Sequence, residues 1–306
     1  MSRIKTLSGR VVCEVHLLDN SMKTLLIEPT TTVENVVRTM AEKLGFAKPA
    51  DDCLCFSLHE CKDGVTIERS LPASAEVVQR MEEWEEDSAK FVFMAKLFTE
   101  SLLASEDPKI IYMLYIQAVY NIITGTYPCN EDEAVQLAAL QFQAKFGKHN
   151  PATHIPGFLT DSLLEYIPGP HLSTSSKEPS DWEKLIFQKH ARAMTELPMQ
   201  TYMNILSKRE YYGAILFAAK QEFTRSMPKR LFVGISRNGI VFPHNLTTLP
   251  QETLARYPLS EIYRWAYKPG INFYFEIKGE EGDEENPVFT FQTAEGSHMS
   301  ELLTDY

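Results

Sequence analysis

The side chains that most often carry chemistry, cysteine and histidine, form no recognisable site in this sequence. The five cysteines contain no CxxC pair, and no histidine stands at the spacing of a zinc ligand. They are Cys13, Cys53, Cys55, Cys61 and Cys129. Their odd number also argues against a disulfide framework. We therefore expect reduced thiols in a cytosolic protein, with no bound metal.

The remaining motifs give no indication of an enzyme. His149 and His154 lie in a loop after a predicted helix, and no cysteine or carboxylate falls at ligand spacing, so capping or solvated roles are favoured over metal binding. No GxSxG elbow, HExxH helix or complete Walker loop occurs, although Gly147-Lys148 resembles a fragment of the last. We expect a non-catalytic protein without a cofactor.

Composition limits the partners that the whole chain can bind. Its 306 residues are 44% hydrophobic, enough for two domains of about 150 residues or three smaller ones. The net charge of −11 repels nucleic acid and anionic bilayers, so any contact with lipid must be local. The N-terminal segment has no apolar stretch of signal-peptide length, and no run of about 18 apolar residues occurs, which predicts a cytoplasmic protein that does not span a bilayer.

Residues 1–98 have the element order of a ubiquitin-like β-grasp. Two β-rich runs, VVCEVHLL and KTLLIE, flank a turn at Asp19-Asn20-Ser21. A helix follows, with a capping box from Thr31 to Glu34 and a closing glycine at Gly45. The short strands LCFSLHE, VTIERSL and KFVFMAKLF complete the lobe, and the acidic run EVVQRMEEWEED is predicted to be a solvated helix or loop outside the core.

Residues 99–207 are predicted to be a bundle of five helices. The first begins near Pro108 and ends at Gly125, and Asn130 with Glu133 caps the second. A short helix covers 160–167, HLSTSSKEPS is expected to be loop, Ser180 with Glu183 caps the fourth helix, and a last helix carries Tyr202.

Residues 208–306 change to a period of two. Six β-runs, from YGAILFAAKQ to VFTFQT, are separated by turns, of which Asn238-Gly239 is the strongest hairpin signal. The chain finishes in an amphipathic helix with Met299, Leu302, Leu303 and Tyr306 on one face. Antiparallel strands with one terminal helix are typical of a pleckstrin-homology or phosphotyrosine-binding fold.

Several strings resemble the FERM domain, above all in talin heads and in the MyTH-FERM tails of unconventional myosins. In the middle lobe these are LYIQAVYNIITGTYPCNEDEAVQLAALQFQAKFGKHNP, GFL and KLIFQKH, and in the third lobe YYGAILFAAK, KRLFVGISRNGI, EIYRWAY and VFTFQTAEGSHMSELL. The resemblance covers nearly the whole chain. It implies an α+β protein of three lobes: a ubiquitin-like β-grasp, an acyl-CoA-binding-protein-like helical bundle, and a PH/PTB-like β-sandwich with a C-terminal helix. We also expect this chain to be a fragment of a longer protein.

The resemblance implies a peptide groove in the third lobe, where an extended ligand adds to the free edge of the strand SEIYRWAYK. Arg264 and Trp265 match positions at that edge. We expect alternate residues to point to opposite faces and the terminal helix to form the far wall. The predicted peptide-binding set is Ile262, Tyr263, Arg264, Trp265, Ala266, Tyr267, Met299, Leu302 and Leu303.

Core packing is the alternative for part of this set. A stripe of Met299, Leu302 and Leu303 at helical spacing more often packs the sandwich core than lines a groove, and the pattern favours core packing there. Arg264 and Trp265 are balanced between the two roles, because arginine and tryptophan are favoured interface anchors.

Acidic lipid is a second predicted ligand, through Lys220, Arg225, Lys229 and Arg230 around the first hairpin of the third lobe. Against it, 209–306 hold ten basic and thirteen acidic residues, a net of −3, and the matching hairpin of talin heads is richer in lysine. A merely solvated hairpin is therefore favoured. The acidic segments 82–87 and 280–285 are expected to be solubilising faces or loops, with docking of a basic segment of the parent protein as the alternative.

The predicted function is that of an adaptor that links cytoplasmic tails of membrane proteins, and acidic phospholipids, to the cytoskeleton at the cell cortex. One alternative is the cargo-binding tail of a motor, which recognises partners at the junction of the first and third lobes. Another is a module fused to a kinase or phosphatase in the parent chain. The fragment itself is expected to be a monomer.

Overall fold

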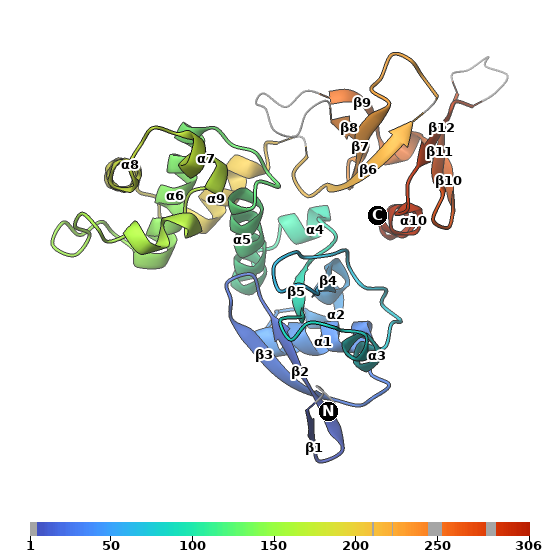
Figure 1. The fold of residues 1–306 in the computed structure, drawn as a ribbon, viewed down its shortest axis with the longest axis horizontal. Coiled ribbons are helices and arrows are strands. Elements are labelled where there is room, and N and C mark those ends of the chain that lie inside the picture. Colours follow the sequence, from blue (N-terminus) through green and yellow to red (C-terminus); the bar gives the residue numbers. More distant parts are fainter. Residues whose placement is uncertain (1–4, 210, 222, 244–252, 280–285) are drawn as a thin grey trace.

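Three lobes lie at the corners of a triangle in the computed structural model (Figure 1). The structure describes residues 5–209, 211–221, 223–243, 253–279 and 286–306. The three-lobe prediction is confirmed: a β-grasp-like sheet comes first, a helical lobe second, and an antiparallel sandwich with a final helix third. No helix in these described ranges is long and apolar enough to cross a membrane.

The first lobe packs helix α1 against a mixed sheet of order β1-β2-β5-β4, with β3 paired to β2. Strands β2 and β5 run parallel, as a β-grasp requires. The α1 cap is formed by Thr32 and Asn35, one residue beyond the predicted Thr31 and Glu34. The elements of the first lobe are β1 (Thr6–Leu7), β2 (Arg10–His16), β3 (Met22–Ile27), α1 (Val33–Leu44), α2 (Pro49–Asp52), β4 (Phe56–Cys61), α3 (Val77–Glu82) and β5 (Lys90–Ala95).

Two predictions in this lobe are wrong. The run 65–71 is not a strand, because it pairs with β4 only through a single bridge between Ser70 and His59. The acidic run contains α3, whose Val77 and Val78 are buried, and the Trp84 ring packs 4.6 Å from the Phe91 ring. The prediction from the charge of this segment put it outside the core, but the apolar residues among its carboxylates hold it against the core.

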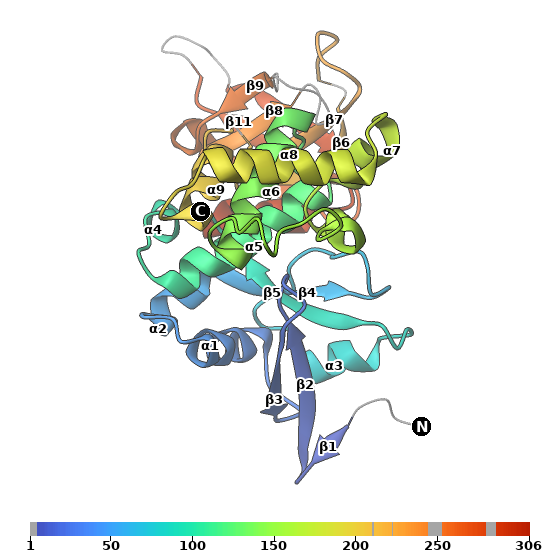
Figure 2. The ribbon, with the colours of Figure 1, turned by 90° about the vertical axis from the view of Figure 1, so that its left-hand side faces the viewer.

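The middle lobe is built on α5 and α6, with α8 lying across it in the turned view (Figure 2). The caps at Asp107 and Asn130 accept backbone N–H groups as predicted for helix starts. Three of these predictions differ in detail. The helix expected at 160–167 is a 3₁₀ turn over Thr160–Glu165, α7 occupies part of the predicted loop, and α8 begins with a box between Glu178 and Asp181 instead of Ser180 and Glu183. The elements are α4 (Glu100–Leu103), α5 (Pro108–Ile123), α6 (Glu131–Phe146), a 3₁₀ turn (Thr160–Glu165), α7 (Gly169–Thr174), α8 (Pro179–Arg192) and α9 (Pro198–Leu206).

The third lobe is an antiparallel sheet of order β10-β11-β12-β6-β7-β8-β9, covered by α10. The hairpin at Asn238-Gly239 forms as predicted between β7 and β8, whereas β9 is a strand that the sequence pattern missed. The elements are β6 (Ile215–Gln221), β7 (Arg230–Ser236), β8 (Gly239–Pro243), β9 (Thr253–Tyr257), a 3₁₀ turn (Leu259–Glu261), β10 (Ile262–Lys268), β11 (Asn272–Ile277), β12 (Val288–Gln292) and α10 (Gly296–Asp305).

Candidate peptide edge and lobe junction

Strand β10 lies at one edge of the third-lobe sheet. Among the described residues it pairs only with β11, and α10 packs against both strands. An edge strand presents unpaired N–H and C=O groups on its outer side, which another extended chain can complete. The predicted strand therefore has the position that peptide addition requires.

A β-bulge changes which side chains of β10 share a face. Ile262 pairs with Ile277 and Arg264 pairs with Glu276, so Tyr263 is the extra residue. Since Ile277 and Glu276 are neighbours on β11, their partners point to opposite faces. The predicted alternation, which put Ile262 on the same face as Arg264 and Ala266, is wrong at this point.

Beyond the bulge, β10 offers aromatic surface. Trp265 lies opposite the buried Phe275 and is half-buried against the core. Tyr263 and Tyr267 are 58% and 42% exposed. Ala266 is half-buried opposite Tyr274. The edge thus combines an anchored indole ring with two accessible phenol rings.

Arg264 is already paired. Its Nε donates to the carboxylate of Glu276, which also accepts a 2.9 Å bond from the Asn286 amide. The hydrogen bond from Asn286, followed by that from Arg264, lowers the pKa of Glu276. A ligand anion at Arg264 would compete with this carboxylate.

The predicted wall residues of α10 belong to the core. Met299 has no exposed surface, and Leu302 and Leu303 are buried beside it. Tyr306, on the same helix face, accepts a 3.0 Å hydrogen bond from the backbone N–H of Phe98 in the first lobe. The stripe therefore packs against the sheet under β10 and connects two lobes. Because Met299 is fully buried, it cannot line a groove for a ligand.

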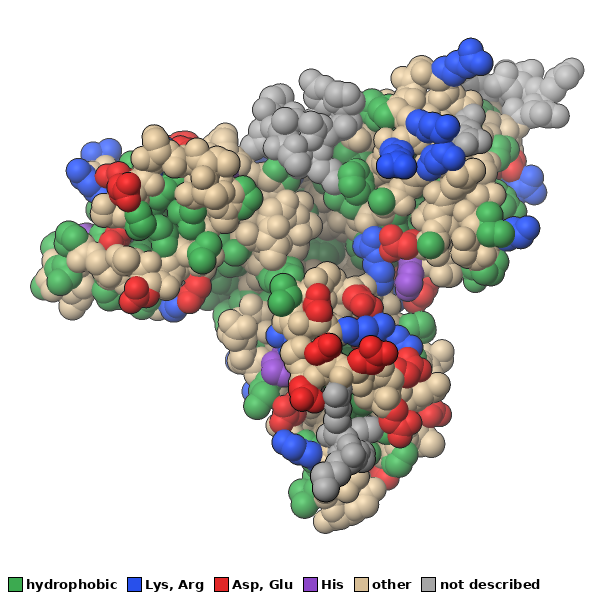
Figure 3. Space-filling view, viewed as in Figure 1, with side chains coloured by type: hydrophobic (Ala, Val, Ile, Leu, Met, Phe, Trp, Pro, Cys, Tyr) green, Lys and Arg blue, Asp and Glu red, His purple; other side chains and the backbone are tan. Residues whose placement is uncertain are grey.

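The four basic residues of the predicted lipid site lie on the β6–β7 hairpin. Arg225, Lys229 and Arg230 are exposed, whereas Lys220 donates a 3.0 Å bond to Gln292. Lysine and arginine side chains gather over this outer end of the third lobe, and acidic side chains gather on the first lobe (Figure 3). The acidic segment 82–87 includes exposed carboxylates of the first lobe, and the second acidic segment, 280–285, lies outside the described residues.

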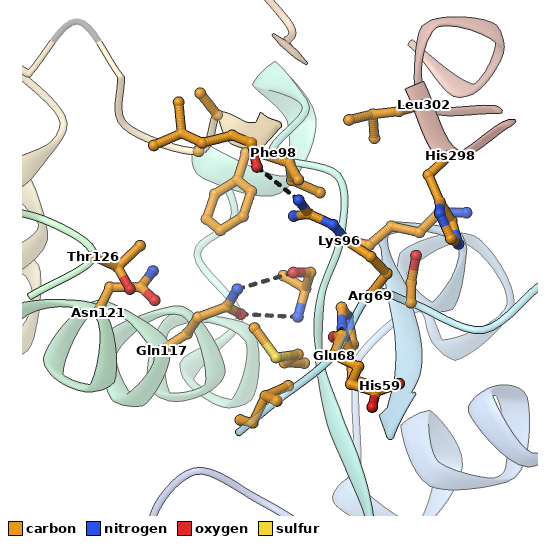
Figure 4. Close-up of a pocket in the computed structure, with 18 of the residues that line it drawn as sticks. His59, Glu68, Arg69, Lys96, Phe98, Gln117, Asn121, Thr126, His298 and Leu302 are labelled. Carbon is orange, nitrogen blue, oxygen red and sulfur yellow. Dashed lines mark hydrogen bonds between the residues drawn. The ribbon is translucent and has the colours of Figure 1, made fainter. Parts of the chain in front are cut away.

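The residues that connect the first lobe to the third were not identified from the sequence. Arg69, which lies in the segment between β4 and α3 and is labelled in Figure 4, donates to Glu295. It also forms a 2.7 Å bond to the carbonyl of Leu216. Lys96 lies 2.6 Å from Asp305 and 3.6 Å from Glu301 on α10. These ion pairs tie the first lobe to the third.

A cavity of about 280 Å³ lies where the three lobes meet. His59 lines it, is 6% exposed, and bonds through Nδ1 to the carbonyl of Glu68 at 3.0 Å. Burial is the main cause that lowers the pKa of His59, to about 4, and the charges of Lys96 and Arg69 add to it. Gln117 closes one side through paired 2.9 Å bonds to the backbone of Ala95 (Figure 4).

The described residues contain no group of three side chains able to hold a metal ion. The His149 ring lies 5.3 Å from His154 in a tilted contact and 5.8 Å from His190 in an edge-on contact, near the Phe187 ring, in keeping with a packing role. All five cysteines are free, and burial raises the pKa of Cys13 to about 12 and that of Cys129 to about 11. Neither of these two thiols is activated as a nucleophile.

Three family models match consecutive parts of the chain. Residues 9–98 match the RA-like domain, 100–217 the FERM central domain, and 217–306 the PTB domain of the IRS-1 type. Among relatives, talin of Oscarella pearsei is 27% identical over 95% of this chain and 12% of its own length. Talin-B of Dictyostelium discoideum is 28% identical over 96% of this chain and 10% of its own length. The chain thus spans only about a tenth of these two relatives.

Solved structures show the same fold. The complex of the FERM and C-terminal domains of Drosophila Merlin has a TM-score of 0.75 at 18% identity, over 96% of this chain and 94% of that one. The MyTH4-FERM MF2 domain of Dictyostelium discoideum myosin VII has a TM-score of 0.74 at 17% identity, over 96% and 58%.

Proposed function

Because this chain belongs to the FERM family, we propose that it is an adaptor module whose third lobe binds a cytoplasmic-tail peptide of a membrane protein along β10. The edge position of β10 carries the proposal, since among the described residues its outer side has no strand partner. Backbone hydrogen bonds to the edge supply affinity, and the aromatic side chains supply selectivity. FERM domains are typically non-catalytic, in agreement with the absence of motifs in the sequence.

The parent chain would connect this module to the cytoskeleton at the cell cortex. The likeness to talins supports that location, and PTB-type lobes bind peptides. In this assignment Trp265 and Tyr267 contact the ligand from one face of β10, and Tyr263 contacts it from the bulge, where its ring lies 6.0 Å from the Arg264 guanidinium. Arg264 and Ala266 lie on the face opposite Trp265, and Ile262 and the α10 stripe hold the strand in place.

We expect Trp265→Ala to weaken binding of an Asn-Pro-x-Tyr tail peptide about 30-fold, because loss of an interface tryptophan typically costs about 2 kcal/mol. Isothermal titration with wild type and variant measures it. Phe232→Ala, at an aromatic residue 41% exposed on β7, is the matched control and should bind as wild type does. Equal affinity of the Trp265 variant and wild type would remove the β10 assignment.

A second candidate is recognition at the lobe junction, as in the cargo-binding tail of a motor. The observation in its favour is the cavity between the lobes, which the β10 assignment does not use. Under this alternative Trp265→Ala is nearly silent in partner binding, whereas substitutions in the cavity are not.

Acidic lipid is proposed as a weak additional ligand of the β6–β7 hairpin. Each basic side chain near an anionic surface contributes about 1 kcal/mol, so Arg225, Lys229 and Arg230 together give a measurable attraction. We expect sedimentation with liposomes to rise with phosphoinositide content, to fall with salt, and to be lost when all three residues become glutamate. Sedimentation of the wild type that stays flat as phosphoinositide content rises would exclude this site.

A further inference from the structure

The segment 148–158 lies between α6 and the 3₁₀ turn of the middle lobe, and it brings three histidine rings together. The His149 ring lies 5.3 Å from the His154 ring and 5.8 Å from the His190 ring of α8. His154 and His190 are only 8% and 1% exposed, and both rings contact the fully buried Phe142 of α6. A positive charge on one of these rings therefore disfavours a charge on the next.

The turn inside this segment requires a neutral His154. The backbone N–H of Asn150 donates to His154 Nδ1 at 3.0 Å, and the backbone N–H of His154 donates to the Asn150 carbonyl at 2.8 Å. Because Nδ1 accepts a hydrogen bond, it carries no proton, and Nε2 carries the single proton of the neutral ring. A proton on Nδ1 would turn this acceptor into a second donor and break the bond to Asn150.

A buried carboxylate holds the other end of the segment. Glu183 of α8 is 2% exposed and accepts the backbone N–H groups of Gly157 at 2.9 Å and Leu159 at 3.2 Å. Between the Asn150 turn and Glu183, every residue of 148–158 except His149 and His154 is exposed. The two histidines are thus the side chains with which the segment covers the lobe.

The charged side chains of the surrounding elements do not compensate a charge on these rings. They face solvent or other partners: Lys145 pairs with Glu165, Lys189 lies 4.0 Å from Asp132, and Lys148, Asp161, Lys184, Arg192 and Glu196 are exposed. Glu183 is engaged with the backbone of the segment.

Burial is the main cause that lowers the pKa of both His154 and His190, and the charge of His149 lowers both further. The Gly147 backbone acts against the shift at His190 without cancelling it. A histidine whose pKa is lowered by folding stabilises the folded segment fully above about pH 6.5, and this contribution is lost as the pH falls toward the lowered value. Acid therefore weakens the attachment of the segment.

We propose that 148–158 is an acid-sensitive strap, which covers the aromatic rings of α6 and α8 while its histidines are neutral and detaches when they become charged. Protonation breaks the Asn150 bond to His154 and places like charges on neighbouring rings. Detachment uncovers Phe142 and Phe187, whose rings lie 5.3 Å apart. The middle lobe then presents an apolar surface in acid that it covers at neutral pH. This inference depends neither on the β10 edge nor on the lipid site.

Hydrogen exchange with mass spectrometry on the full chain at pH 7.0 and 5.5 tests the strap. Protection is expressed relative to an unstructured chain at the same pH, which removes the direct effect of pH on exchange. We expect protection of the 150–159 amides to fall at least tenfold. One histidine that is neutral in the attached strap and titrates normally in the detached one changes the opening equilibrium by about tenfold at pH 5.5. Amides of α5 in the same lobe should keep their protection.

Four variants separate the imidazoles from other causes. His154→Asn places an amide oxygen near the position of Nδ1, and His190→Gln replaces the second ring with a neutral side chain. Together they should reduce the fall in protection to less than twofold, and each alone should reduce it in part. His298→Gln, in the third lobe, is the matched control and should respond as wild type does. Glu183→Gln should lower protection at both pH values and leave the fall between them.

A fall of wild-type size in the double variant would overturn the proposal. A response that disappears only in Glu183→Gln would do the same, because the carboxylate would then be the group that senses pH. Unchanged protection in the wild type, or an equal loss of protection in α5, would also refute a local strap. If the double variant does not fold, the two single variants decide, and a full response in both of them counts against the strap.

Discussion

Gly239→Ala is expected to destabilise the third lobe by about 4 kcal/mol. Gly239 has φ of 104°, and a Cβ at this position would lie 2.1 Å from the carbonyl oxygen of Tyr257. A left-handed conformation of this kind costs a non-glycine residue about 1–3 kcal/mol, and displacement of the chain after β9 costs a similar amount. Hydrogen exchange with mass spectrometry should show earlier exchange in β7 and β8 than in α5 and α6 of the same sample.

Gly270→Ala is the matched control. Its φ of 67° is also positive, but no atom lies within 4 Å of the added Cβ. The cost should therefore be at most about 1 kcal/mol, part of which is offset by reduced freedom of the unfolded chain. If the two substitutions destabilise the lobe equally, contact with the chain after β9 is not what requires glycine at 239.

Local sequence patterns predict a turn or a helix cap correctly where the signal depends on a few adjacent residues. The Asn238-Gly239 turn and the Asn130 cap are each indicated by a few adjacent residues, and both form as expected. Where a neighbouring residue can also cap the helix, the observed cap lies one or two residues from the predicted one. Thr31 and Thr32 have the same chemistry, and the choice between them depends on whether residue 35 can bond back to the cap, which Asn35 does.

Local sequence patterns do not predict an element correctly where its form depends on contacts with residues far away in the sequence. The bulge at Tyr263 exists only in relation to β11, and nothing within β10 indicates it. Helix α7 forms in a segment whose composition resembles a loop, and its His171 bonds to the Cys129 carbonyl at 2.7 Å from another part of the lobe. Tertiary contacts thus override composition in such short elements.

The contacts between the first and third lobes are the features that local sequence patterns predict least. Arg69 and Glu295 are separated by 226 residues, and each one alone is an ordinary surface charge. Core packing is the role that the sequence favours for the apolar stripe of α10, and the structure has it there, whereas the hydrogen bond between Tyr306 and Phe98 depends on how the first lobe is placed. Recognition of a FERM domain predicts three lobes, whereas the groups between them are specific to this chain.

Acidification from pH 6.5 to 4 should cost the folded protein about 3 kcal/mol through His59 alone. The pKa of His59 is about 4 in the folded state and 6.5 in an unfolded chain, because burial, Lys96 and Arg69 disfavour the cation. Between these values the unfolded state binds more protons, so the free energy of unfolding falls as pH falls. The contribution is complete above pH 6.5, and a difference of about 2.5 pKa units corresponds to about 3 kcal/mol.

Urea denaturation of wild type and His59→Gln at several pH values between 7.5 and 4.5 isolates this contribution. The variant is expected to be less stable at neutral pH and to lose the steepest part of the dependence, so the difference between the two proteins narrows on acidification. His190 acts in the same direction, since burial lowers its pKa as well, and His190→Gln tests the middle lobe separately. Parallel curves for wild type and the His59 variant would mean that His59 titrates normally in the folded protein. In that case the cavity at the lobe junction would be open to water.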